Sequence, residues 1–252
     1  MHTTTTAKTI ARWVIEFPVL ARVFERHGID YCCGGKRALA EVCHEKGLTV
    51  EQLLRELEGG ELTAGRHSLD CSRMTMTELA DHIVATHHDW LSTELPRLAN
   101  MVKRVEDVHA EHHPEIHELR HVLASLQDEM EAHMWKEEHV LFPMIKTLDA
   151  ADLMPKLHCG SIVQPIQVME YDHQNVGDAI EKMRMLTNDY TPPPEACSTY
   201  HLMLEGLAEL EADTHRHVHK ENNILFPAAA RKEVWLVRDV RKAVDPQEVA
   251  EV

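Results

Sequence analysis

The segment His133–Pro143 reads HMWKEEHVLFP, and the segment His217–Pro227 reads HVHKENNILFP. Both place glutamate four residues after the first histidine, leucine eight residues after it, and Phe-Pro directly behind that leucine. Each copy closes a mostly apolar series with steps of three and four residues, which is the spacing of one helix face. The two series are Leu119, Leu123, Leu126, Met130, His133, Glu137 and Leu141, and Met203, Leu207, Leu210, Thr214, His217, Glu221 and Leu225.

Two more predicted helices carry one inward histidine each. The copies above are offset by 84 residues, and His88 and His173 are offset by 85, so a helix pair is repeated along the chain. Two such pairs pack as an antiparallel four-helix bundle with approximate two-fold symmetry. The remaining inward series are Val84, His88, Leu91 and Leu95, and Ile166, Met169, His173, Val176, Ile180 and Met183.

Composition and domain organisation agree with an all-α protein. Glycine and proline are scarce, with ten and eleven residues in 252. A small helical domain with the adjacent cysteines Cys32 and Cys33 is predicted over residues 1–58, and a polar linker with three glycines over 59–73. The four-helix bundle then covers 74–243, and 244–252 form a C-terminal tail.

Net charge and cysteine spacing argue against several kinds of partner and site. A formal charge of −16 disfavours nucleic acid and anionic lipid, because both need a basic surface. No signal peptide and no apolar run long enough to cross a bilayer is recognisable, so we expect a cytoplasmic protein. The cysteines form no CxxC pair, which argues against a zinc ribbon or a disulfide scaffold. The roles of Cys43, Cys71, Cys159 and Cys197 stay open.

Glu137 and Glu221 lie on inward faces, where an uncompensated carboxylate is costly. A pair of metal ions compensates both. Histidine and glutamate four residues apart lie one turn apart on the same helix face. Imidazole and carboxylate donors without thiolate favour iron, with manganese or zinc as weaker choices. The predicted site therefore holds two non-haem iron ions, bridged by both glutamates and an oxo or hydroxo group. Its predicted ligands are His88, His133, Glu137, His173, His217 and Glu221.

Other histidines compete for these roles among the twenty in the chain. The alternative reading of any single histidine is a hydrogen-bonded core or surface residue. The repeat selects His133 and His217 over their neighbours. The competing residues are His82, His87, His109, His112, His117, His121, His139, His215 and His219.

The chain resembles the iron-sulfur cluster repair di-iron proteins, a hemerythrin-like family. The resemblance rests on DYCCGG at Asp30–Gly35, EYDH ending at His173, and the two repeated segments, and it covers nearly the whole length. It implies the same six iron ligands, and a role in restoring iron-sulfur clusters damaged by nitric oxide or peroxide. It also suggests His109 near the site, although His109 has no place on an inward stripe.

For Cys32 and Cys33 the resemblance implies a functional thiol pair, redox-active or able to contact iron in transit. The alternative is two thiols that stabilise a tight loop. The chain departs from oxygen-carrying hemerythrin, which uses five histidines with a pair on its third helix. Here His173 lacks that partner, so simple reversible oxygen carriage is disfavoured.

Three functions follow from these observations. The first is repair of damaged iron-sulfur proteins, by supplying iron. The alternatives are reduction of nitric oxide at the di-iron centre, and a non-catalytic sensor or binding protein for dioxygen or nitric oxide. Architecture alone does not separate them, because function resides in the site and its partners. The sequence leaves enzymatic activity and a homodimer open.

Overall fold

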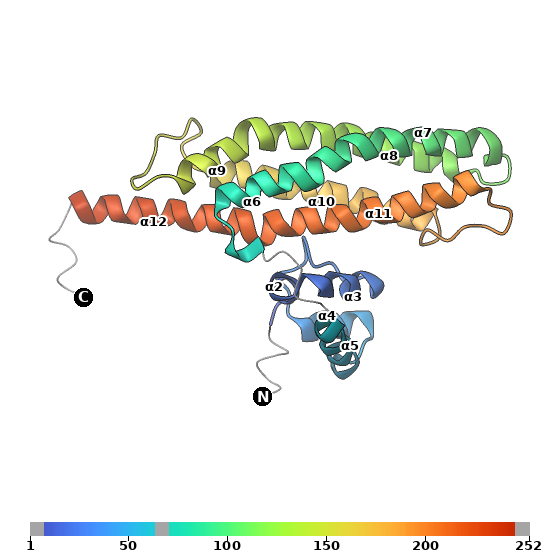
Figure 1. The fold of residues 1–252 in the computed structure, drawn as a ribbon, viewed down its shortest axis with the longest axis horizontal. Coiled ribbons are helices and arrows are strands. Elements are labelled where there is room, and N and C mark those ends of the chain that lie inside the picture. The colour runs from blue at the N-terminus through green and yellow to red at the C-terminus, as the bar shows by residue number, and fades with distance from the viewer. Residues whose placement is uncertain (1–7, 64–70, 245–252) are drawn as a thin grey trace.

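A computed structural model describes residues 8–63 and 71–244 of the chain. In this part every regular element is a helix, which confirms the all-α prediction. Four long helical arms lie side by side in an elongated bundle, and a small helical domain lies against one side of it (Figure 1). Among the described helices, none combines the length and apolar character needed to cross a bilayer.

The four arms follow the predicted order. Each proceeds through one or more helical elements, and short connections link neighbouring arms into antiparallel pairs (Figure 1). The first arm contains α6 (Met76–Ile83), η3 (Val84–His88) and α7 (Asp89–His109). The second contains α8 (Glu115–Lys136), η4 (Glu137–Leu141) and α9 (Phe142–Asp149). The third is α10 (Val163–Leu186), and the fourth contains α11 (Ser198–Lys220), η5 (Glu221–Leu225) and α12 (Phe226–Val244).

Three arms contain one wide turn of π-helix, formed by η3, η4 and η5. At each of them the amide after the turn bonds five residues back, as from Phe142 to the carbonyl of Glu137 and from Phe226 to that of Glu221. Such turns insert an extra residue and are frequent at functional sites. The third arm, α10, is continuous α-helix.

The inward residues predicted for the second, third and fourth arms are all buried. The first arm differs at one position. Val84 is half-buried, and Ile83 is fully buried instead. The prediction for Val84 is therefore wrong. The π turn explains why, because its extra residue shifts the inward face by one position between Ile83 and His88.

Two apolar cores fill the bundle on either side of the histidines and glutamates. One core runs from Leu91 to Leu210 between α7, α8, α10 and α11. The other joins Leu79, Phe142 and Phe226 near the α6, α9 and α12 end. The polar residues thus form a layer enclosed by packed apolar side chains, which excludes water from it.

The bundle arms begin with different caps. Thr75 and Glu78 form the predicted capping box at α6. The α10 entry has no side-chain cap of its own. There Glu233 of α12 accepts hydrogen bonds from the Ile162 amide at 2.9 Å and the Ser161 hydroxyl at 2.9 Å.

The N-terminal domain has its own core, which includes Trp13, Phe24 and Tyr31. Its last helix continues through Gly59 and Gly60, so the first residues of the segment predicted as a linker are helical. Residues 64–70 of that segment and 245–252 of the predicted tail lie outside the described residues. The elements are α2 (Ile10–Glu16), η1 (Pro18–Leu20), α3 (Ala21–Arg26), α4 (Leu39–Lys46) and α5 (Val50–Thr63), followed by η2 (Cys71–Arg73).

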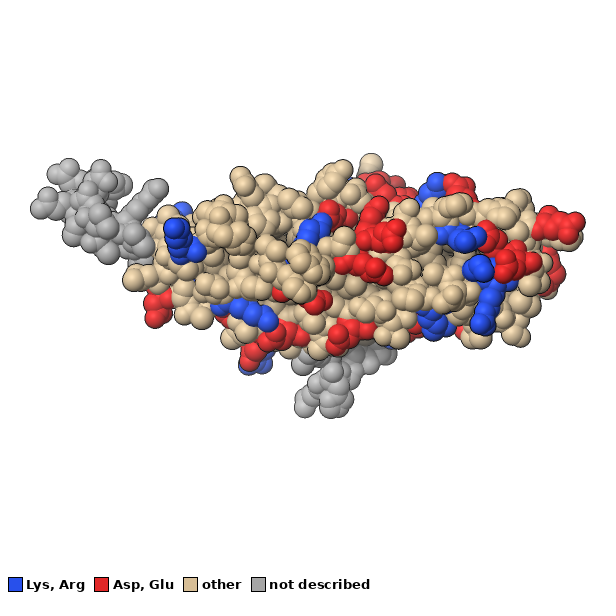
Figure 2. All heavy atoms as spheres, turned by 90° about the horizontal axis from the view of Figure 1, so that it is seen from above, with Lys and Arg blue, Asp and Glu red and all other residues tan. Residues whose placement is uncertain are grey.

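Charged side chains are mixed on the surface. Figure 2 shows one face of the molecule, on which Lys and Arg lie among Asp and Glu rather than in a continuous basic track. That face therefore offers a polyanion no extended region of positive charge to neutralise its phosphates.

Candidate metal centre

The six predicted ligands come together in the middle of the bundle. Each arm contributes a histidine, and the second and fourth arms add the glutamates. The side chains form two groups of potential metal ligands, whose donor atoms in each group lie within 4.8 Å of one another. Both groups contain Glu137 and Glu221. The first adds His88 and His217, and the second adds His133 and His173.

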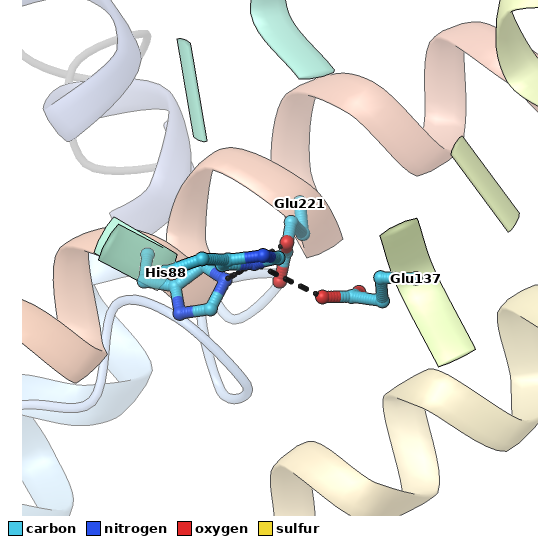
Figure 3. A group of neighbouring side chains, drawn as sticks. His88, Glu137 and Glu221 are labelled. Atoms are coloured by element: carbon cyan, nitrogen blue, oxygen red, sulfur yellow. Dashed lines mark hydrogen bonds and ion pairs between the residues drawn. The ribbon is translucent and has the colours of Figure 1, made fainter. Parts of the chain in front are cut away.

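The donor atoms converge on the two glutamates. The Nε2 atoms of His88 and His133 lie 3.4 and 3.2 Å from Glu137 Oε2. Those of His173 and His217 lie 3.1 and 3.0 Å from the Glu221 oxygens. Figure 3 shows His88, Glu137 and Glu221 reaching toward one another from separate elements. Each carboxylate is therefore shared by imidazoles from two arms.

The glutamates have unusual surroundings for buried carboxylates. Both are 0 % exposed. In the described part of the chain, neither oxygen of Glu137 has a hydrogen-bond donor, and Oε2 of Glu221 has none either. Buried charges are stable only when they are paired or coordinate metals. Close imidazole nitrogens without hydrogen-bond geometry are expected where lone pairs point at a shared cation, so the donor set fits a pair of metal ions.

Without metal, the surroundings of His88 and His133 favour protonated imidazoles. Burial lowers the pKa of His133, but the charge of the nearby Glu137 and the contact with Asp172 outweigh burial and raise it to about 10. Burial raises the pKa of Glu221, but the nearby imidazoles of His217, which is within hydrogen-bond distance, and His173 outweigh burial and hold it well below its usual range. The site therefore favours ionised carboxylates facing cations.

A second layer of side chains orients three of the imidazoles. His88 Nδ1 lies 2.8 Å from Glu138 Oε1, and His173 Nδ1 lies 2.9 Å from Asn222 Oδ1. His133 Nδ1 lies 3.5 Å from Asp172, which also accepts a hydrogen bond from the Lys136 ammonium. Bonds of this kind fix the imidazole tautomer that leaves Nε2 free for a metal.

Sequence reasoning did not single out Glu138, Asn222 or Asp172. A signal for them exists, because Glu138 and Asn222 directly follow the inward glutamates and Asp172 directly precedes His173. A residue next to a ligand on a helix can reach the neighbouring arm and meet the imidazole there. The fourth imidazole differs, since His217 Nδ1 has no hydrogen-bond partner among the described residues.

Several competing histidines surround the centre without joining either group. His87 stacks on His217 with ring centroids 5.3 Å apart, and its Nδ1 pairs with Asp213. His82 and His87 both accept hydrogen bonds from the Lys220 ammonium. Burial lowers the pKa of His87 to about 4, so it is neutral at pH 7. His87 thus lies against the first metal group without completing it, and His82 contacts His87.

His109 lies far from the six residues. It ends α7, 21 residues after His88 along a continuous helix, a separation of about 30 Å at the α-helical rise. Its Nε2 lies 3.3 Å from Cys197 Sγ, and its ring contacts Tyr200. The proximity that the resemblance suggested for His109 is therefore wrong for this chain.

The loop with Cys32 and Cys33 docks against the fourth arm beside the centre. Asp30 organises the loop, because its Oδ1 accepts from the amides of Cys32 and Cys33 at 2.8 and 3.0 Å. Gly35 permits the tight chain path, since a Cβ there would lie 2.3 Å from the Tyr31 carbonyl oxygen. The two sulfur atoms lie 3.9 Å apart, and with Asp30 they form a third potential metal-binding group.

Three residues close to Glu221 on the fourth arm contact this loop. His219 Nδ1 lies 3.1 Å from the Tyr31 carbonyl oxygen, and Asn223 Nδ2 donates to the Cys32 carbonyl at 2.8 Å. Asn222 Nδ2 lies 3.8 Å from Cys33 Sγ. Cys33 Sγ is also 3.9 Å from the His173 carbonyl oxygen. The thiol is thus one side chain away from the second metal group.

A four-helix bundle with a buried set of four histidines and two glutamates defines a hemerythrin-like metal protein. The family model described as the Hemerythrin HHE cation binding domain matches residues 79–229, and this chain belongs to that family. Residues 6–60 match the model of the ScdA_N domain, described as a domain of unknown function. Membership of the hemerythrin family implies non-haem iron binding.

Curated relatives share both parts of the chain. Proteins named iron-sulfur cluster repair protein YtfE, from strains of Escherichia coli, from Citrobacter koseri and from Shigella boydii, are 37 % identical over 215 residues. These alignments cover 85 % of this chain and 93 % of each relative. The similarity confirms the family resemblance drawn from the sequence.

Proposed function

We propose that this chain repairs damaged iron-sulfur clusters by supplying iron from a dinuclear centre. The observation that carries the proposal is the docking of a two-thiol loop beside a buried two-metal donor set, with Asn222 between Cys33 and His173. A protein that only binds a diatomic ligand has no need of thiols at that place. The relatives named as cluster repair proteins support the same function.

The donor set supports two irons that share Glu137 and Glu221. Both carboxylates belong to both groups, so each can bridge, and each iron receives two imidazoles. Iron bound by these six residues would have coordination positions left for dioxygen or nitric oxide. It would supply Lewis acidity and redox chemistry, while the bundle excludes water and holds the imidazoles in place.

Cys32 and Cys33 are proposed as the residues that contact iron on its way to a client. Cys32 is 7 % exposed and Cys33 is half-buried, so the pair lies between the enclosed centre and solvent. The hydrogen bond to Cys33 and burial raise the pKa of Cys32 well above its ordinary value. Cys32 is therefore a thiol until a cation displaces its proton, which limits metal capture at this residue in the resting protein.

The proposal is tested by following isotopically labelled iron. The protein is loaded anaerobically with ⁵⁷Fe, its iron is counted, and Mössbauer spectra are recorded before and after addition of a damaged [4Fe–4S] protein and a reductant. Transfer of ⁵⁷Fe into the client's cluster supports repair. Turnover of nitric oxide without such transfer would assign the chain to the reductase alternative instead.

Cysteine variants separate the thiol role from general loss of sulfhydryls. The double variant Cys32→Ser, Cys33→Ser is expected to keep its iron and to transfer it much more slowly. The matched control is Cys159→Ser, Cys197→Ser, because both of these cysteines are exposed and lie outside the loop. Equal transfer by the two double variants would remove Cys32 and Cys33 from the mechanism.

A further inference from the structure

The two halves of the bundle use different groups for the same task. The 84-residue offset pairs Glu138 with Asn222, each directly after an inward glutamate. Glu138 holds the imidazole of His88 at 2.8 Å, and Asn222 holds that of His173 at 2.9 Å. One imidazole thus faces a carboxylate and its counterpart faces a neutral amide.

The other two imidazoles also differ, since His217 Nδ1 has no hydrogen-bond partner among the described residues, so the comparison rests on His88 and His173. Asp172 lies 3.5 Å from His133, but its charge is shared with the Lys136 ammonium at 2.5 Å. Among the described residues, the only polar partner of the Glu138 carboxylate is His88. The uncompensated carboxylate next to a ligand imidazole therefore belongs to the group of His88 and His217.

A carboxylate partner makes an imidazole a stronger donor than an amide partner does. Changing such a partner alters metal affinity by about 10- to 100-fold. Through His88, the position served by His88 and His217 is thus expected to hold its metal more tightly. The position served by His133 and His173 is expected to hold its metal less tightly, although both share the same two glutamates.

The weaker position is also the one next to the thiol loop. Asn222 is buried, its Oδ1 faces His173, and its Nδ2 faces Cys33 Sγ at 3.8 Å. A second contact brings Cys33 Sγ to 3.9 Å from the carbonyl oxygen of His173 itself. Glu138 makes no corresponding contact with the described part of the N-terminal domain. The two metal positions therefore differ in their distance from the Cys33 thiol as well as in the partners of their imidazoles.

We propose that the metal position of His133 and His173 releases its ion first, beside Cys33, and that Asn222 is the positioning residue that sets this order. The difference between the two positions is a difference in metal affinity. Its use in iron delivery rests on the proposed function. Asn222 acts through His173, because an amide in place of a carboxylate leaves that imidazole the weaker donor.

The test measures metal release without any client. The full-length protein is loaded anaerobically with Fe(II), and release to an excess of a coloured chelator is followed in time. Wild type is expected to release iron in two phases of equal amplitude. Asn222→Asp gives His173 a carboxylate partner and should slow the fast phase by about 10-fold or more, leaving the slow phase in place. Glu138→Gln should accelerate the slow phase instead.

Controls separate the positioning role from charge and folding. Gln174→Glu adds a negative charge beside His173 on the exposed side of α10 and should change neither phase. Circular dichroism and thermal melting check each fold, and the visible bands of Co(II)-loaded protein report on ligand geometry. If Asn222→Asp does not fold, Glu138→Gln alone must still bring the two phases closer together.

Two results would overturn the inference. One is a single release phase in wild type. The other is an Asn222→Asp variant that slows both phases equally or leaves the fast phase unchanged. The release test uses a chelator as the iron acceptor and is therefore independent of cluster repair. If iron is released in two phases but is never transferred to a damaged cluster, the proposed function is refuted and the difference between the two metal positions stands. Transfer to clusters from a single-phase protein would do the reverse.

Discussion

The two halves of the bundle share their proposed ligands but differ in several of the groups that surround them. Each half contributes two histidines and one glutamate at repeated positions. Only the first half has a π turn on its first arm, and the second half forms the hydrogen bonds with the Tyr31–Cys33 loop. A duplicated helix pair can therefore preserve the proposed metal ligands while their neighbours diverge, and the proposed difference between the two metal positions depends on those neighbours.

Loss of either glutamate should produce the largest effect, and the same effect from both halves. Because Glu137 and Glu221 each belong to both groups, Glu137→Ala and Glu221→Ala should each reduce bound iron from about two per chain to nearly none, as a buried site missing a shared carboxylate cannot balance two cations. Elemental analysis measures this. Glu131→Ala, at an exposed position of α8, serves as control. Retention of one full iron by either variant would show that its glutamate does not bridge.

Core substitutions at equivalent positions should also act equally. Leu126 and Leu210 lie 84 residues apart, and each is 1 % exposed in the same apolar core. Leu126→Ala and Leu210→Ala should each lower the free energy of unfolding by about 2–5 kcal/mol, from lost burial and the cavity left behind. Urea denaturation of the metal-free protein gives both values. A difference above about 2 kcal/mol would show that the halves are packed unequally.

Gly206 should reveal a real difference between the halves. A Cβ at Gly206 would lie 2.6 Å from Leu98 Cδ2 and 3.0 Å from Arg97 Nη2, so α11 approaches α7 closely there. Its counterpart in the first half is Val122, which is half-buried. Gly206→Ala should destabilise the protein by about 1–3 kcal/mol through overpacking, despite the better helix propensity of alanine. Val122→Ala should cost less. Denaturation curves that rank them the other way would contradict the close approach.

The helix caps should give the smallest effects. Removing the Glu233 carboxylate with Glu233→Ala leaves the buried Ile162 amide unpaired and should cost about 1–3 kcal/mol. Thr75→Ala removes an exposed cap and should cost about 1 kcal/mol. Thermal melts at matched pH compare the two. The reverse order would indicate that water replaces Glu233 at the start of α10.

Much of the bundle could be predicted from the sequence because helical periodicity states which residues point inward. The stripes of the second, third and fourth arms are buried as predicted, and the six side chains proposed as ligands lie together. The shift from Val84 to Ile83 escaped prediction, since a π turn on the first arm alters the phase of the face within a single turn.

The π turns of the other arms had a signal in the sequence. His133, Glu137 and Leu141 follow two successive steps of four, as do their counterparts in the second copy. In an unbroken α-helix two such steps rotate the stripe by about 80°. One extra residue, accommodated in a π turn, is therefore needed to keep all three side chains inward. The third arm has no such double step and remains α-helical.

Other features could not be predicted because they depend on contacts between distant segments. The approach of Cys33 to Asn222 joins residues 189 positions apart. The cap on α10 comes from Glu233, 71 residues after Ile162. Periodicity describes one helix at a time, and it carries no information on which side chains of another element complete a hydrogen bond.

One short segment, residues 219–223, serves two partners at once. It contains Glu221 of the metal centre, and His219, Asn222 and Asn223 also form polar contacts with the Tyr31–Cys33 loop. A substitution in this segment would affect both the candidate metal centre and the docking of the N-terminal domain, so selection acts on it through both. Relatives with another residue in place of Asn222 or Asn223 should therefore also differ in the loop. The two segments should covary among relatives.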